Sequence, residues 1–193
     1  CRKKIYFWGK QVICYYYTKN KNDKKKFNES KKNIIFLTRK LPQKIEEKLQ
    51  KKYTVILNKS DKKYTYAELK KKVSDIDILV PCISDTIDAS IIKAARKLKL
   101  ISNFGNGVDN LDLVTAKENN IVVTNTPDVL TEDTADLVLT MILMISRKVL
   151  EAQKDLVNGN WSGWGPSETM GTRVRGKQVG IIGMGRIGSA VAK

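Results

Sequence analysis

The chain has 193 residues, of which 41% are hydrophobic and 29% charged, and its formal net charge is +16. This hydrophobic fraction excludes a chain that is disordered throughout, and the length predicts one medium-sized domain or a small domain with part of a second. The longest apolar run, residues 137–145, is far shorter than the roughly 20 residues of a membrane-spanning helix, so no membrane association is expected.

Positive charge is concentrated at the start of the chain, where residues 1–33 hold eleven lysines and arginines against two acidic residues. The stretch TKNKNDKKKFNESKK has no hydrophobic period, so residues 1–32 are predicted to be a basic, disordered leader outside the fold. No small-residue cleavage site follows the aromatic segment at its start, which argues against a signal peptide. No DNA- or RNA-binding motif accompanies the charge, so no nucleic-acid partner is expected; a polyanion site on the leader is the alternative.

From Asn33 onward, short apolar runs alternate with amphipathic segments, and Asp88 is placed to cap one of the helices. Such alternation predicts a parallel sheet with helices on both faces, here a first domain over residues 33–130. The expected strands are 33–39, 53–57, 75–81, 100–104 and 120–125, and the expected helices 42–52, 65–73, 88–99 and a segment near 109–119.

The sequence changes in character after residue 130, where a second domain is expected to begin. Residues 131–159 are predicted to form one long apolar helix, with Thr131 as its N-cap and Gly159 at its C-terminus. A loop marked by glycine, tryptophan and proline follows, and the run KQVGIIG predicts a new buried strand at residues 177–183. Residues 131–193 are therefore expected to supply a linking helix and the first strand–turn–helix of this domain.

The sequence GMGRIG places glycines at 183, 185 and 188, which is the GxGxxG spacing, between a predicted strand and a predicted helix. Gly183 would allow a tight turn, Gly185 would let a pyrophosphate approach the backbone, and Gly188 would let the helix lie close to the sheet. The exposed amides at the helix N-terminus, those of Arg186 and Ile187, would face the anion. The motif predicts dinucleotide binding; a purely structural glycine turn is the alternative.

A second glycine-bearing stretch, NFGNGVDN at residues 103–110, lies between a predicted strand and a predicted helix. Gly105 and Gly107 allow backbone dihedrals closed to other residues, so consecutive amides could point into one concavity and bind a carboxylate. Asp109 would cap the helix that follows. From spacing alone, an ordinary strand-to-helix turn is an equal alternative.

The cysteines Cys1, Cys14 and Cys82 form no CxxC pair, and the chain has no histidine, so no metal site is predicted. Sparse, unpaired thiols suit a reducing cytoplasm. Cys82 is interpreted as buried filling of the core. Trp161 and Trp164 are interpreted as packing or interface anchors.

Together these stretches resemble the D-2-hydroxyacid dehydrogenases, most closely their glyoxylate/hydroxypyruvate reductase branch. The resemblance extends over residues 33–193 and is weaker in the first 65 or so of these. It is carried by NFGNGVDNLDL, NTPDVLTEDTADLVLTMIL, NGNWSGWGP and GKQVGIIGMGRIGSAVAK, which occur in the order and spacing of the family.

The resemblance implies an α/β fold: a flavodoxin-like parallel-sheet substrate domain followed by the beginning of a Rossmann dinucleotide-binding domain, with the active site in the cleft between them. It also implies NAD or NADP as cofactor, a small 2-keto or 2-hydroxy acid as substrate, and a homodimer. The substrate carboxylate would be held by Asn106, Gly107 and Val108. Thr134 would lie near the nicotinamide, and the phosphates would lie on Met184, Gly185, Arg186 and Ile187.

The family's chemistry uses an arginine, a carboxylate and a histidine that all follow the glycine motif, so no catalytic residue is expected within this chain. The residue that discriminates NAD from NADP is also expected beyond Lys193. The chain is therefore interpreted as an inactive fragment of a glyoxylate or hydroxypyruvate reductase. A non-catalytic relative that senses a dinucleotide or acts as a scaffold is the alternative.

Overall fold

The computed structural model describes residues 5–8, 12–16, 33–167 and 169–193. The chain divides into two compact units, Cys1–Val129 (unit 1) and Leu130–Lys193 (unit 2). No helix in the described ranges is both long enough and apolar enough to cross a membrane.

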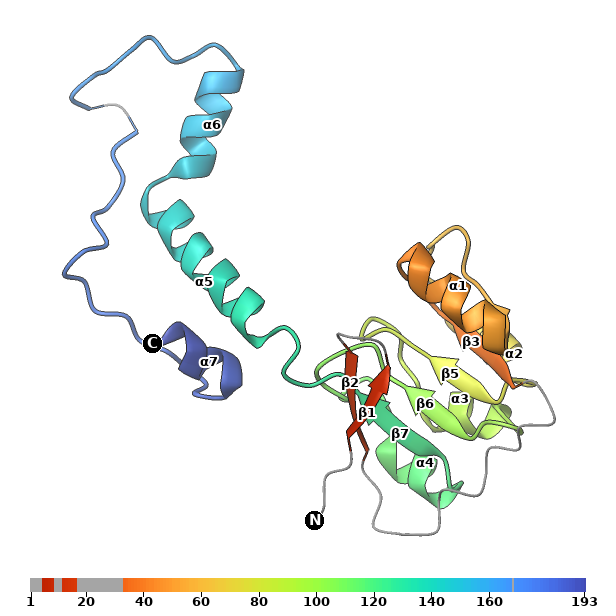
Figure 1. Ribbon diagram of the computed structural model, residues 1–193. Coiled ribbons are helices and arrows are strands. Elements are labelled where there is room, and N and C mark those ends of the chain that lie inside the picture. The colour runs from red at the N-terminus through yellow and green to blue at the C-terminus, as the bar shows by residue number, and fades with distance from the viewer. Residues whose placement is uncertain (1–4, 9–11, 17–32, 168) are drawn as a thin grey trace. The chain divides into compact units, whose positions relative to one another are not determined.

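Unit 1 is built on a seven-stranded sheet in the order β1-β2-β7-β6-β5-β3-β4 (Figure 1). The five strands β3 to β7 are parallel, and the position of β3 between β4 and β5 gives them the flavodoxin-like order 2-1-3-4-5. The predicted α/β fold class is thereby confirmed. The strands are β1 (Ile5–Trp8), β2 (Val12–Tyr16), β3 (Ile34–Leu37), β4 (Thr54–Ile56), β5 (Ile78–Val80), β6 (Leu100–Ser102) and β7 (Val122–Asn125).

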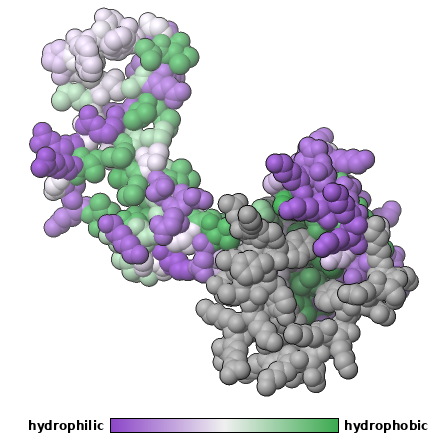
Figure 2. Space-filling view, viewed as in Figure 1, coloured by the Kyte–Doolittle hydropathy of each residue, from purple (hydrophilic) through white to green (hydrophobic). Residues whose placement is uncertain are grey.

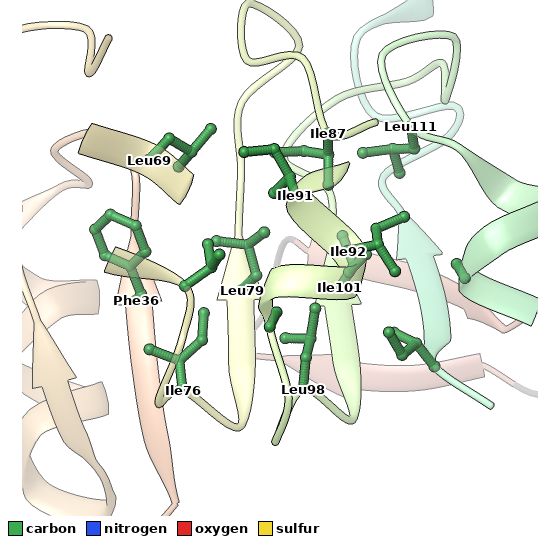
Figure 3. Packing of buried hydrophobic residues seen from close by; sticks show 14 residues of the cluster. Phe36, Leu69, Ile76, Leu79, Ile87, Ile91, Ile92, Leu98, Ile101 and Leu111 are labelled. Carbon is green, nitrogen blue, oxygen red and sulfur yellow. The ribbon is translucent and has the colours of Figure 1, made fainter. Parts of the chain in front are cut away.

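Helices connect the parallel strands, and side chains that alternate along each strand form a core on either face of the sheet. On one face, Phe36 of β3 and Leu79 of β5 pack with residues of α2, α3 and α4 (Figure 3). On the other face, Ile35 of β3 and Ile78 of β5 pack with α1. The helices are α1 (Gln43–Lys52), α2 (Tyr66–Lys72), α3 (Ala89–Ala94) and α4 (Leu113–Glu118).

Side chains cap the N-termini of three helices in unit 1, namely α2, α3 and α4. Asp88 caps α3 as predicted, because its carboxylate accepts a hydrogen bond from the N–H of Ile91. The helix ends at Ala94 and not near residue 99, because the chain turns there and the N–H of Ala95 donates to the carbonyl of Ile92. The predicted cap of α4 by Asp109 is wrong; Asp112 accepts the capping hydrogen bond from Thr115.

The edge of the sheet beyond β7 differs from the sequence prediction, which expected no strand in residues 1–32. Strands β1 and β2 form an antiparallel hairpin, and β2 pairs with β7 through Tyr15 opposite Asn125 and Tyr16 opposite Thr124. The segments IYFW and VICYY are rich in aromatic and β-branched residues, which favour strands even beside charged sequence. The remaining residues of the predicted leader lie outside the described residues.

Unit 2 contains α5 (Thr131–Ser146), α6 (Val149–Val157) and α7 (Arg186–Val191), of which α5 and α7 contact each other. The prediction of one helix over residues 131–159 is wrong, because Lys148 adopts a left-handed conformation with φ 52° and separates α5 from α6. The predicted Thr131 N-cap is also wrong: Leu130 occupies that position, and no side chain caps the helix. Gly159 does follow the end of α6, with φ 71°.

The strand predicted at residues 177–183 is absent from the structure, which shows an irregular segment there. A strand needs a neighbour to bond its N–H and C=O groups, and among the described residues of unit 2 no other segment forms a strand. The side chains of Val179 and Ile182 are correspondingly exposed. The apolar pattern alone therefore does not produce a strand in this segment.

Candidate functional site

The first candidate site is the glycine loop, residues 103–110, which follows β6 at the carboxyl edge of the parallel sheet. Gly105 and Gly107 are expected from the sequence to allow backbone dihedrals closed to other residues, but neither glycine has a positive φ. A Cβ atom at Gly105 would overlap the exposed side chain of Ile83, which would have to shift. Gly107 is exposed, and a Cβ atom there would meet only Asp109 Oδ2, at 3.7 Å.

Three consecutive carbonyl groups of the glycine loop accept hydrogen bonds from neighbouring residues. The carbonyl of Gly105 accepts from the N–H of Thr126 at 2.9 Å, and that of Asn106 from Asn125 Nδ2 at 2.7 Å. The carbonyl of Gly107 accepts from Asn103 Nδ2 at 2.9 Å. In a trans peptide the C=O and N–H point in opposite directions, and the chain has no cis peptide among its described residues. The N–H groups of Asn106, Gly107 and Val108 are therefore directed away from these partners.

The outward amides have the chemistry of an anion site. In the part of the chain that the structure describes, the N–H groups of Gly107 and Val108 donate no hydrogen bond to the protein. Adjacent amides that donate to no acceptor in the described protein suit a carboxylate, since an ionised acceptor forms short, charge-assisted hydrogen bonds. The structure thus brings together the predicted substrate residues Asn106, Gly107 and Val108, and their role in substrate binding stays a prediction.

A neighbouring turn, residues 82–85, follows β5 and is fixed from within. Asp85 is 2% exposed and accepts from the N–H of Cys82 at 2.9 Å and from the hydroxyl of Thr38. Thr38, at the end of β3, is fully buried and also accepts from the N–H of Cys82 at 3.2 Å. The thiol of Cys82 is free and only partly buried, which differs from the predicted core filling.

Sequence reasoning missed the polar side chains that organise this edge of the sheet: Thr38, Asp85, Asn103 and Asn110. The acceptor at Asp85, three residues after Cys82, was the one local signal, because Asp side chains commonly bond nearby backbone N–H groups in turns. Thr38 and Asn110 reach their hydrogen-bond partners in residues 82–85 only because of the order of the strands in the sheet, which the sequence does not reveal locally.

The first charged side chain beyond β3 is Arg39, which is paired and therefore not a free cation at this edge. Arg39 Nε lies 2.8 Å from Asp61 Oδ1, and its Nη2 lies 3.1 Å from Asp61 Oδ2. The guanidinium, together with the N–H of Lys40, lowers the pKa of Asp61 to about 2, and Asp61 raises the pKa of Arg39.

The second candidate site is the glycine turn, residues 183–188, in unit 2. Gly183 has φ 96°, which favours glycine, and a Cβ atom at Gly188 would overlap the carbonyl oxygen of Gly183. Gly185 is the N-cap of α7, and no heavy atom lies within 4 Å of the position that its Cβ atom would occupy. A turn at Gly183 and open space at Gly185 are thus present in the predicted order. The expected close packing of the helix on a sheet at Gly188 is not found in the described part of unit 2, because no strand precedes the turn and the close contact at Gly188 is with Gly183.

The other predicted cofactor residues lie on the elements around this turn. Arg186 and Ile187 begin α7, and Met184 is 62% exposed. Thr134 lies in the first turn of α5, the helix that contacts α7, and is partly buried. The described residues hold no group of three or more Cys, Asp or Glu side chains arranged for a metal ion. The cofactor roles of these residues stay predictions.

Comparison with known proteins gives one consistent result. The family model for the catalytic domain of D-isomer specific 2-hydroxyacid dehydrogenases matches residues 35–183. A glyoxylate reductase of Thermococcus litoralis is 38% identical over 163 residues, which cover 82% of this chain and 49% of that protein. A glyoxylate reductase of Thermococcus kodakarensis is 39% identical over the same shares. The chain thus spans about half the length of the curated relatives it matches.

Solved structures agree with this result. An NADPH-dependent glyoxylate/hydroxypyruvate reductase from Sinorhizobium meliloti, in complex with NADP and malonate, is similar at a TM-score of 0.66 with 30% identity, over 84% of this chain and 49% of that one. A 2-hydroxyacid dehydrogenase from Ketogulonicigenium vulgare is similar at a TM-score of 0.65 with 35% identity, over 83% and 50% of the two chains.

Proposed function

Because the chain belongs to the D-isomer specific 2-hydroxyacid dehydrogenase family, we propose that it forms part of an NAD(P)-dependent oxidoreductase that reduces glyoxylate or hydroxypyruvate to the 2-hydroxy acid. The family is NAD(P)-dependent, which agrees with the predicted cofactor class. A homodimer and a cytoplasmic location, expected from the sequence, stay part of the proposal.

One observation carries the substrate side of the proposal: the outward N–H groups of Gly107 and Val108. A 2-keto acid presents a carboxylate next to its reacting carbonyl, so amides that hold the carboxylate also fix the position of the keto carbon. The carbonyls behind these amides are already bonded, and the loop does not need to rearrange to expose its donors. This preorganisation favours a small anionic substrate.

On the cofactor side, the glycine turn fits a dinucleotide phosphate. The open space at Gly185 would let a phosphate reach the backbone, and the first amides of α7, those of Arg186 and Ile187, would donate to it. Thr134 on α5 would lie beside the nicotinamide end. When bound, the reduced cofactor supplies the hydride that the keto carbon accepts.

Titration of the chain with oxalate, a small planar anion that carries the carboxylate of a 2-keto acid, tests the substrate side. We expect the backbone amide signals of Gly107 and Val108 to shift in a saturable way in nitrogen-15 NMR spectra. The amide of Gly159, in unit 2, serves as a reference that should not move. Unresponsive amides at Gly107 and Val108 would exclude the proposed carboxylate site.

The cofactor side is tested by Gly185→Ala, with Gly180→Ala as the matched control. Neither glycine has a positive φ, and a Cβ atom at either position meets nothing within 4 Å, so both methyl groups are accommodated by the protein itself. Only the methyl group at position 185 would occupy the space of the phosphate. We expect Gly185→Ala to weaken NADH binding, measured by fluorescence titration, about tenfold or more, which corresponds to about 1.4 kcal/mol. Equal affinity in the two variants would contradict the phosphate site.

We further propose that the 193-residue chain does not itself reduce glyoxylate. The family's proton donor is a histidine, and the chain contains none. With NADH or NADPH and glyoxylate, the absorbance of the reduced nicotinamide should decrease no faster than in a blank without the protein. Turnover above the blank would contradict this assignment of the acid, whereas NADH binding without turnover in a longer chain that includes the histidine would favour the dinucleotide-sensing alternative.

A further inference from the structure

We propose that Asn103 and Asn110 are positioning residues that orient the peptide groups of the glycine loop for carboxylate binding. The two side chains form a reciprocal amide pair: Asn103 Nδ2 donates to Asn110 Oδ1 at 3.1 Å, and Asn110 Nδ2 donates to Asn103 Oδ1 at 3.2 Å. They stand at the two ends of the loop, so the pair closes it. This inference rests on the proposed function, because it assigns an effect on substrate affinity.

Asn103 acts on the peptide that carries the outward amide of Val108. Its side chain is 1% exposed, and Nδ2 donates to the carbonyl of Gly107 at 2.9 Å. That carbonyl and the N–H of Val108 belong to one planar peptide group. The bond from Asn103 therefore fixes the direction in which the Val108 N–H points.

Asn110 ties the same loop to the neighbouring turn after β5. Its Nδ2 lies 3.2 Å from the carbonyl of Cys82 and 3.1 Å from the carbonyl of Asp85. The turn is itself held by the buried carboxylate of Asp85. These hydrogen bonds therefore fix the position of the glycine loop relative to the ends of two neighbouring strands, β5 and β6.

A side-chain amide is the group that this arrangement requires. Each member of the pair both accepts from its partner and donates to a backbone carbonyl, and a carboxylate has no donor for the second task. An apolar side chain of similar size would leave buried carbonyls and the partner amide without bonds. The conformation of the glycine loop therefore depends on an asparagine at each of these two positions.

Oxalate titration of the chain and of Asn103→Ala tests the inference, with Asn119→Ala as control. Asn119 also donates from Nδ2 to a backbone carbonyl, that of Thr115 at 2.8 Å, but it does so at the end of α4. We expect the oxalate dissociation constant, read from the Gly107 and Val108 amides, to rise about tenfold in Asn103→Ala, as loss of one hydrogen-bonded constraint predicts. The control should bind as the unsubstituted chain does.

A second measurement needs no substitution and covers the case in which Asn103→Ala does not fold. In the unsubstituted chain, the side-chain NH₂ signals of Asn103 and Asn110 should shift with the same saturation curve as the Gly107 amide, and that of Asn119 should not. Loop amides that respond to oxalate while both NH₂ signals stay unmoved would overturn the inference, as would unchanged affinity in a folded Asn103→Ala. If the loop amides of the unsubstituted chain do not respond at all, the proposed carboxylate site fails, and the inference fails with it.

Discussion

The two units of the chain differ in what holds their glycine-bearing segments in place. In unit 1, three carbonyl groups of the glycine loop accept hydrogen bonds, two from side chains and one from the backbone, and the loop lies next to a buried sheet. In unit 2 the glycine turn depends on the conformation of Gly183 and on the close approach of Gly188. The conformation at Gly183 and the close contact at Gly188 are local to the turn, whereas the glycine loop also bonds Asn125 and Thr126, which lie further along the chain.

The same difference extends to hydrophobic burial. Unit 1 has two buried clusters, one on each face of the sheet. In unit 2, Ala135 is the one hydrophobic residue among those described that is buried, and apolar side chains cover much of the surface of α5 and α6 (Figure 2). Helices can form from their own backbone bonds, so α5 is present without such a core, but the strand expected at 177–183 is not.

The largest expected effect is a difference in the free energy of unfolding between two matched leucine-to-alanine variants, one in each unit. Leu79 on β5 is fully buried, whereas Leu143 on α5 is 52% exposed. Leu79→Ala should lower the free energy of unfolding of unit 1 by about 2–5 kcal/mol, because it removes buried methyl groups and leaves a cavity. Leu143→Ala should change it by less than about 0.5 kcal/mol.

Native-state hydrogen exchange of the β5 and β6 amides measures both truncations on the same reporters. These amides lie in the core of unit 1, so their slowest exchange reports its global unfolding. Comparable losses of protection in Leu79→Ala and Leu143→Ala would show that the two units unfold as one and would remove the contrast drawn above.

A second, smaller effect concerns the acid stability of unit 1. Burial raises the pKa of Asp77, but the N–H of Ile34 at 3.0 Å and the ammonium of Lys99 at 2.7 Å lower it, and the pKa lies below its usual value. The stabilisation from a lowered pKa is present above the unfolded value of about 3.9 and is lost as the pH falls through the folded value. The stability of unit 1 should therefore decrease below about pH 4.

Asp77→Asn tests this pH dependence. The amide cannot titrate, so the decrease in unfolding free energy between about pH 4 and pH 2 should be shallower than in the unsubstituted chain. Denaturant unfolding at a series of pH values measures both slopes. Parallel slopes would assign the acid sensitivity to other carboxyl groups of unit 1, such as Asp61 or Asp112.

The sequence predicts the parts of this molecule that depend on neighbouring residues. The apolar runs after Asn33 correspond to β3 to β7, and the Asp88 cap forms as expected. The order of the glycines at 183, 185 and 188 likewise anticipates the shape of their turn.

The rest depends on partners that are distant in the chain. Thr38 and Asp85 are 47 residues apart and meet only because β3 and β5 are neighbours in the sheet. The Asn103–Asn110 pair requires a loop conformation that the sequence does not specify. The apolar run at 177–183 had the composition of a strand but not its pairing partner.

The smallest expected effect compares the first turns of two helices. Thr65 caps α2 in a reciprocal arrangement, in which its side chain accepts from the N–H of Glu68 and Glu68 Oε2 accepts from the N–H of Thr65 at 2.8 Å. Thr131 opens α5, and its hydroxyl has no hydrogen-bond partner among the described residues. Thr65→Ala should therefore destabilise unit 1 by about 1 kcal/mol, whereas Thr131→Ala should be nearly neutral.

Glu68 supplies an independent reading of the same cap. Hydrogen bonds from the side chain and backbone of Thr65 lower the pKa of Glu68, so Thr65→Ala should move that pKa back toward its usual value. Carbon-13 NMR titration of the Glu68 carboxyl group measures the shift, and amide exchange in α2 and α5 measures the stability changes. The two variants should differ in how much protection their own helix loses. If α5 loses as much protection in Thr131→Ala as α2 loses in Thr65→Ala, the first turn of α5 is stabilised as strongly as that of α2. That result would contradict the difference in hydrogen bonding between the two helices.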